Sequence, residues 1–111
     1  MINVKEELLD TLYQINKTVD DILFINIKLY NKWSDYDNEK IKSETVSTKK
    51  EILNLLDRYD ISYDDGFGSQ NLFGVIVFKD NTWLERYEYD GSEGWDYKKC
   101  PKIEDYKELE L

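Results

Sequence analysis

The 111-residue sequence contains no histidine, one cysteine and one proline. Without histidine, the chain lacks the most common general base, the Ser-His-Asp and Cys-His arrangements and the usual zinc ligand. The single Cys100 cannot form a disulfide within the chain, which opens with no charged-then-apolar leader and no long apolar run. We therefore expect a cytoplasmic protein that is not an enzyme and holds no metal or cofactor.

Negative charge dominates the composition. Acidic residues outnumber basic residues by 24 to 15, which gives a net charge of −9. A surface of this sign repels phosphate backbones and anionic membranes, so direct binding to nucleic acid or to a membrane is disfavoured. Between Asp57 and Asp96, ten acids and three bases carry −7 of the total charge. We expect this part of the chain to meet a basic protein partner.

The first third of the chain carries apolar residues at helical spacing. The members of this seam lie three or four positions apart: Leu8, Leu12, Ile15, Val19, Ile22, Asn26, Leu29 and Trp33. The spacing predicts one long helix over residues 1–33, about 45 Å in length, with an overhang that pairs with a second copy to form a homodimer. An alternative stays open for residues 22–31, which also alternate as a strand does, with one set made of Leu23, Ile25, Ile27 and Leu29.

A connector and a short helix are predicted next. Residues 34–46 are polar and lack periodicity, which is typical of a connector. Thr48 with Glu51 three positions later has the form of a capping box, in which each side chain bonds the other residue's backbone N–H. The helix that follows is predicted over residues 47–59, with a buried face made of Ile52, Leu55, Leu56 and Tyr59.

The period changes to two over residues 61–100, which are predicted as antiparallel strands joined by short turns. The segment 72–78 is apolar on both faces, as a central strand is. Residues 101–111 are predicted as a charged tail. The predicted fold is a single α+β domain over residues 1–111, in which a long N-terminal helix and a short helix pack on a three- or four-stranded antiparallel β-meander.

The last predicted hairpin has two possible registers. If Asp90-Gly91 is a two-residue loop, Arg86 faces Trp95 and can stack on its ring. The same register places two pairs of carboxylates opposite each other: Glu85 with Asp96, and Glu88 with Glu93. Like charges in that position destabilise a sheet, and a loop over residues 90–93 would place Glu85 opposite a lysine instead. The dipeptide favours the short loop and the charges favour the long one, so both stay open.

Arg86 is the only base between Asp80 and Asp96. We expect it to stack on Trp95 and to bridge to carboxylates of the hairpin, with contact to an anionic ligand as the alternative. Because two helices cannot bury both faces of the hairpin, some of its aromatic rings should be exposed, Tyr87 or Tyr89 among them. The predicted partner-binding residues are Asp64, Asp65, Glu85, Arg86, Glu88, Tyr89, Asp90, Glu93 and Trp95.

Three segments follow one another between Ile61 and Pro101: DDGFGSQNLFGVIVF, DNTWLERYEYDGSEGWDY and Cys-Pro. Together they resemble a pattern found in small uncharacterised proteins of phages and other mobile elements. This chain departs from that pattern at Ser69, where the pattern has glycine, and at Gly94, where it has tryptophan. The resemblance implies a phage or prophage origin and implies no activity.

Small acidic phage proteins are often inhibitors of host defences, including anti-CRISPR proteins and mimics of DNA. We therefore expect an anti-defence inhibitor whose carboxylates imitate the charge of a nucleic acid and occupy a basic nucleic-acid-binding surface. Two alternatives stay open. One is an immunity protein or antitoxin against a basic toxin, and the other is a small-molecule sponge with an aromatic pocket around Trp83, Arg86 and Trp95.

Overall fold

The computed structural model describes residues 2–30, 43–63 and 70–100. Within these residues, a five-stranded antiparallel sheet has the strand order β3-β2-β5-β6-β7, and a separate pair joins β1 to β4. The elements are β1 (Ile2–Asn3), α1 (Val4–Gln14), a 3-10 turn (Val19–Asp21), β2 (Ile22–Leu29), β3 (Glu44–Val46), α2 (Lys49–Arg58), β4 (Ser62–Tyr63), β5 (Leu72–Phe78), β6 (Thr82–Tyr89) and β7 (Ser92–Lys99).

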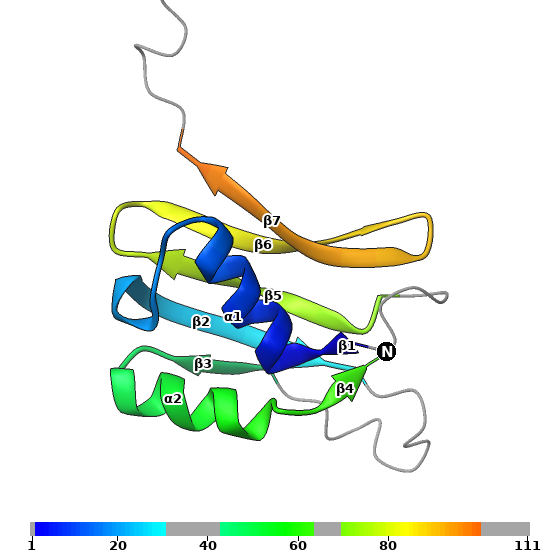
Figure 1. Ribbon diagram of the computed structural model, residues 1–111, viewed down its shortest axis with the longest axis horizontal. Coiled ribbons are helices and arrows are strands. Elements are labelled where there is room, and N and C mark those ends of the chain that lie inside the picture. The colour runs from blue at the N-terminus through cyan, green and yellow to red at the C-terminus, as the bar shows by residue number, and fades with distance from the viewer. Residues whose placement is uncertain (1, 31–42, 64–69, 101–111) are drawn as a thin grey trace, which may run out of the picture.

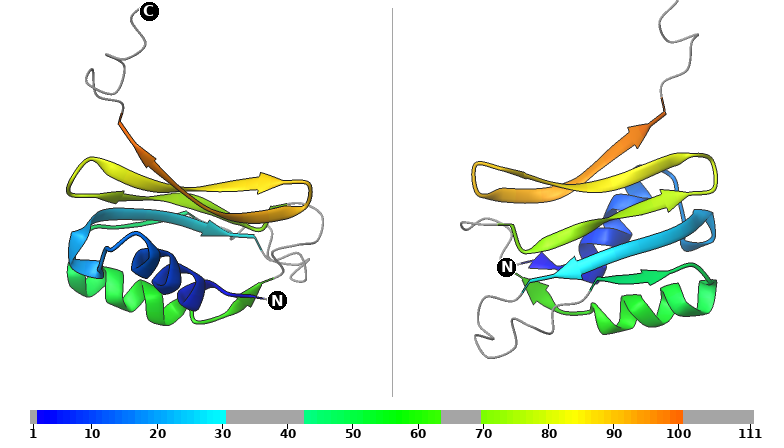
Figure 2. Two further views of the ribbon diagram at one scale, coloured as in Figure 1. Left: turned by 45° about the horizontal axis from the view of Figure 1, so that its top comes forward. Right: turned by 180° about the vertical axis from the view of Figure 1, so that it is seen from behind.

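The described helices cover one face of the sheet. Helix α1 lies across one face, called the inner face here, and α2 runs beside β3 (Figure 1). No described element covers the outer face, as the views from the side and from behind show (Figure 2). The core lies between the inner face and the helices and consists of Val4, Leu8, Leu12, Ile22, Ile25, Ile27, Val46, Ile52, Leu55, Leu56, Tyr63, Leu72, Ile76, Phe78 and Leu84.

The predicted long helix over residues 1–33 is wrong, because α1 ends at Gln14. Asn16 adopts a left-handed backbone with φ of 58°, which a continuing α-helix does not contain. The backbone N–H of Thr18 then donates to Asp21 Oδ2 at 2.8 Å, in a capping box that opens the 3-10 turn. Residues with helical spacing on either side of this break therefore do not share one helix.

The strand alternative is correct for Ile22–Leu29. Ile25 and Ile27 are fully buried on the inner face, while Asn26 points the other way and its Nδ2 donates to Thr45 Oγ1 at 2.9 Å. Pairing with β5 on one side and β3 on the other satisfies the backbone of this segment as a strand. The helical seam on which the expected homodimer rested does not form, and Asn26 joins two strands of one chain.

Part of the predicted connector over residues 34–46 is also a strand. Glu44–Val46 form β3 and pair with β2, while residues 31–42 lie outside the described part of the chain. The short helix is confirmed, since Thr48 Oγ1 accepts from the Glu51 N–H at 3.2 Å and the Thr48 N–H donates to Glu51 Oε1 at 3.2 Å. Its predicted apolar face is buried at Ile52, Leu55 and Leu56.

The predicted sheet over residues 61–100 is partly correct. Strand β5 is the central strand of the five, as expected from its two apolar faces. The meander β5-β6-β7 is extended by β2 and β3, which the predicted three- or four-stranded sheet did not include, and β4 pairs with β1 outside this sheet. Residues 64–69 and the tail predicted over residues 101–111 lie outside the described residues.

The hairpin of β6 and β7 has the two-residue loop. Arg86 pairs with Trp95 and Tyr89 with Ser92, which leaves only Asp90-Gly91 in the turn. Both turn residues have positive φ, 51° and 85°, as a tight hairpin of the type I′ class requires. The four-residue loop is therefore excluded.

The described helices are too short, or too polar, to cross a membrane.

Candidate functional site

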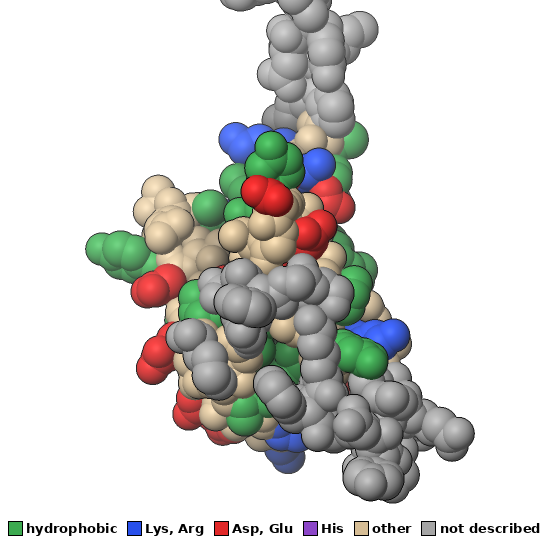
Figure 3. Space-filling model, turned by 90° about the vertical axis from the view of Figure 1, so that its right-hand side faces the viewer, with side chains coloured by type: hydrophobic (Ala, Val, Ile, Leu, Met, Phe, Trp, Pro, Cys, Tyr) green, Lys and Arg blue, Asp and Glu red, His purple; other side chains and the backbone are tan. Residues whose placement is uncertain are grey.

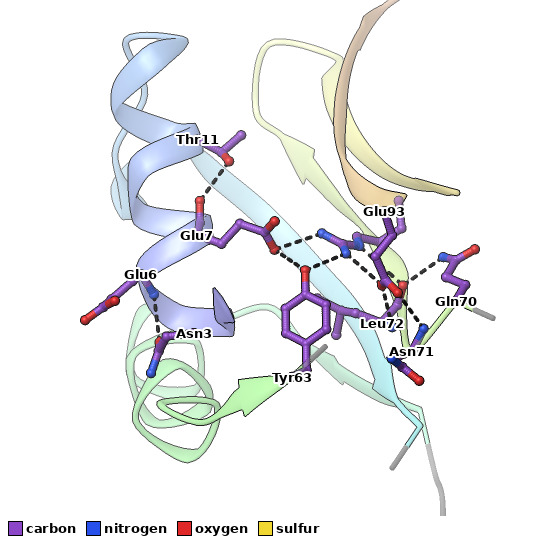
Figure 4. A network of polar contacts seen from close by, with 10 residues as sticks. Asn3, Glu6, Glu7, Thr11, Tyr63, Gln70, Asn71, Leu72 and Glu93 are labelled. Carbon is purple, nitrogen blue, oxygen red and sulfur yellow. Dashed lines mark hydrogen bonds and ion pairs between the residues drawn. The ribbon is translucent and has the colours of Figure 1, made fainter. Parts of the chain in front are cut away.

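The side chain of Arg86 lies on the inner face and is only 1% exposed. Its Nη1 lies 3.0 Å from Glu7 Oε1 on α1, and its Nη2 lies 2.9 Å from Glu93 Oε1 on β7. The same Nη2 donates to Tyr63 Oη on β4 at 2.8 Å, and Nε donates to the Leu72 carbonyl at 3.3 Å. One guanidinium thus bonds to four other elements of the fold, and we call these residues the Arg86 network (Figure 4).

Glu93 connects the Arg86 network to the beginning of β5. Its side chain is 2% exposed. Its two carboxylate oxygens accept the backbone N–H groups of Asn71 and Leu72, both at 2.8 Å. Hydrogen bonds from two backbone amides and a guanidinium compensate a buried carboxylate for the water it has lost. Glu93 therefore fixes the place where the chain enters the central strand.

Tyr63 completes the network as a neutral hydroxyl. Burial raises the pKa of Tyr63 well above its ordinary value, and the hydrogen bond to Glu7 raises that pKa further. The hydroxyl donates to Glu7 Oε1 at 2.6 Å while it accepts from Arg86. Burial on its own would lower the pKa of Arg86, but Tyr63, Glu93 and Glu7 raise it, so Arg86 stays charged.

The geometry gives Arg86 a structural role. Its guanidinium carbon lies 4.9 Å from the centre of the Trp95 ring, so the predicted stacking on Trp95 and bridging to a hairpin carboxylate are confirmed. Glu93 and Arg86 are buried in this arrangement and lack the exposed surface that a partner contact needs. Their place among the partner-binding residues stays a prediction.

The aromatic pocket expected around Trp83, Arg86 and Trp95 does not form. Successive residues of a strand point to opposite faces, and Leu84 and Arg86 point to the inner face. Trp83 therefore stands on the outer face, whereas Trp95 lies opposite Arg86 on the inner face and packs against the core. The sheet itself separates the two tryptophans.

Aromatic side chains are exposed on the outer face near the hairpin loop. Phe73 is 41% exposed, Tyr87 is 46% exposed and Tyr89 is 78% exposed. The expected exposure of Tyr87 or Tyr89 is confirmed for both. The Tyr87 ring also covers Gly94, because a Cβ at that position would lie 2.8 Å from the Tyr87 hydroxyl oxygen. Tyr87 thus fills the space that a side chain at position 94 would need.

Most of the described acids between Asp57 and Asp96 form an ion pair within the chain. Asp57 lies 3.0 Å from Lys5, Asp80 lies 2.6 Å from Lys17, and Lys98 lies 2.9 Å from Glu85. Around the hairpin loop the situation differs, because Glu88 and Asp90 are exposed and make no ion pair with any described residue. We call Phe73, Tyr87, Glu88, Tyr89 and Asp90 the hairpin-tip surface. Tyr87 and Tyr89 lie on its outer side, whereas Glu88 faces Glu93 on the inner side and accepts the Gly91 N–H at 2.9 Å. Acidic and hydrophobic side chains lie together at this end of the molecule (Figure 3).

The other predicted partner-binding residues fall in different places. Asp64 and Asp65 lie outside the described residues. Glu85 is partly exposed on the outer face, where it faces Asp96 and bonds to Lys98. Sequence reasoning missed Glu7 and Tyr63 in the Arg86 network and Phe73 on the outer face. A signal existed for Glu7, which lies beside the apolar residues of α1 that are buried.

Within the described residues, no three His, Cys, Asp or Glu side chains are grouped so that they could hold a metal ion. Comparisons of the chain with protein-family models, curated proteins and solved structures find no match.

Proposed function

We propose that this protein is a binding protein that occupies the basic, nucleic-acid-binding surface of another protein through its hairpin-tip surface. It would act as an inhibitor of a host defence system, in line with the resemblance to phage proteins. One observation supports the proposal most strongly. Exposed tyrosines and acids without an ion pair alternate along the chain up to the loop, as Tyr87, Glu88, Tyr89 and Asp90.

Each part of the hairpin-tip surface has a role in such a contact. Tyrosine rings supply large contact areas at low entropic cost and are enriched among the residues that dominate binding energy. Exposed carboxylates without an ion pair complement arginine and lysine side chains and speed the encounter. The Arg86 network holds Glu93, the second residue after the loop, so the tip extends from a fixed base. A preformed surface of this kind loses little entropy on binding.

The test is affinity capture from a nuclease-treated bacterial lysate. We expect the intact protein to retain a nucleic-acid-binding protein that added DNA or RNA displaces, and that raised salt releases because exposed charge pairs are screened. A variant bait with Glu88→Gln and Asp90→Asn should retain at least about tenfold less of this protein. The control bait, Glu6→Gln with Asp10→Asn, loses the same two charges from exposed positions on α1 and should capture normally.

Either of two results would contradict the proposal. In the first, added DNA or RNA does not displace the captured protein from the bait. In the second, both charge variants lose the partner to the same extent, which would make net charge, and not the hairpin-tip surface, the cause of binding.

A further inference from the structure

Strand β7 forms an open edge of the five-stranded sheet. It pairs with β6 over all of its length, from Ser92 to Lys99, and no described strand pairs with its other side. The opposite edge, β3, is only three residues long and has α2 beside it. A long open edge presents unpaired backbone groups to any other strand that reaches it.

The register shows which backbone groups of β7 are open. In a hairpin with a two-residue loop, the residues next to the loop form a hydrogen-bonded pair, and such pairs then alternate along the ladder. Starting from Tyr89 and Ser92, the residues of β7 that bond to β6 are those with even numbers. The backbone N–H and C=O groups of the others point away from the sheet, and these residues are Glu93, Trp95, Tyr97 and Lys99.

A second copy of β7 fits this edge in antiparallel orientation. With Tyr97 opposite Tyr97 of the second copy, Trp95 lies opposite Lys99, and the open backbone groups of both strands face each other. On the outer face, Asp96 then lies opposite Lys98 of the second copy, and the two-fold axis creates this pair twice. Opposite charges at directly facing positions stabilise a sheet. The next register that keeps the same face inward, with Asp96 opposite Asp96, places like charges together.

The same arrangement gives Asp96 a lysine from the second copy, so that Asp96 and Glu85 no longer share one lysine. Glu85 and Asp96 face each other across β6 and β7, and both rely on Lys98 of their own chain, at 2.9 Å and 3.8 Å. In the paired arrangement, Asp96 would have Glu85 on one side and Lys98 of the second copy on the other. We propose that the protein forms a two-fold dimer by antiparallel pairing of β7 with β7 of a second copy, with Tyr97 at the axis.

Sedimentation velocity of the full chain tests this dimer over micromolar to near-millimolar concentrations. Physiological ionic strength is needed because two copies of charge −9 repel each other and salt screens that repulsion. We expect a shift from a species of 13.3 kDa to one of twice that mass. Lys99→Pro removes an N–H on the open side of β7 and leaves the hydrogen bonds to β6 intact. This variant should weaken the dimer at least about tenfold, with little change in melting temperature.

A charge exchange tests the register. Asp96→Lys and Lys98→Asp, each alone, should weaken the dimer because they place like charges opposite each other, and the double variant should restore it. A protein that stays monomeric at the highest concentration would overturn the proposal. A dimer that withstands Lys99→Pro, or whose charge exchange brings no recovery, would also overturn it by showing that the copies meet elsewhere.

Discussion

Arg86→Ala is expected to lower the free energy of unfolding by about 3–5 kcal/mol, because removing one member of a buried ion-pair network leaves the other charges unpaired. Glu93 would remain buried with its backbone partners only, and Glu7 would keep only the hydroxyl of Tyr63. Thermal or urea unfolding measures the loss. The stability of Arg86→Lys should lie between that of Arg86→Ala and that of the intact protein. An ammonium group keeps the charge but cannot reproduce the planar fork that reaches Glu7, Tyr63 and Glu93 together.

The matched control is Arg58→Ala. Arg58 also forms an ion pair with a glutamate at 3.0 Å, Glu44, but its side chain is 51% exposed. Exposed pairs contribute about 1 kcal/mol or less, so this variant should unfold close to the intact protein. If the two alanine variants lost similar stability, the Arg86 network would not be the structural centre that its geometry indicates.

Gly74→Ala is expected to cost about 3 kcal/mol or more, which corresponds to a fall in melting temperature of about 10 °C or more. Gly74 lies in the central strand with φ of 148°, a conformation that other residues rarely adopt. A Cβ built there would overlap the backbone oxygen of Asn26 on β2, and backbone in the middle of a sheet cannot move aside.

Gly94→Ala is the control for Gly74→Ala. A Cβ at Gly94 meets the Tyr87 ring, which is the end of a side chain at the surface and can swing away. We expect a loss of at most about 1 kcal/mol. Equal losses at the two glycines would contradict the close contact between β5 and β2.

Local signals in the sequence predicted the elements whose structure is decided locally. The capping box of Thr48 and Glu51 predicted the start of α2, because it depends on residues three positions apart. Asp90-Gly91 favoured the two-residue loop that forms, but the facing carboxylates left the register open. The segment 22–29 satisfies helical and strand spacing equally well. Its structure is decided by β5, which is far away in the sequence, and by the break at Asn16.

The same distinction explains which parts of the site were predictable. The contact of Arg86 with Trp95 follows from the hairpin register alone, and the exposure of Tyr87 and Tyr89 follows from covering one face of a sheet. Glu7 lies 79 positions from Arg86, and Tyr63 lies 23 positions away. Only the packing of α1 and β4 against the sheet brings them to the guanidinium. Sequence reasoning therefore counted Arg86 and Glu93 among surface residues.

Isothermal titration of the captured partner with a Tyr87→Ser, Tyr89→Ser variant tests most directly whether the hairpin-tip surface is the binding site. Tyr13→Ser serves as the control, because Tyr13 is 83% exposed on α1, away from the hairpin. We expect the double variant to melt as the intact protein does but to bind about 30-fold more weakly or worse, while the control binds normally. Unchanged affinity in a double variant that melts normally would show that the hairpin-tip surface is not the binding site.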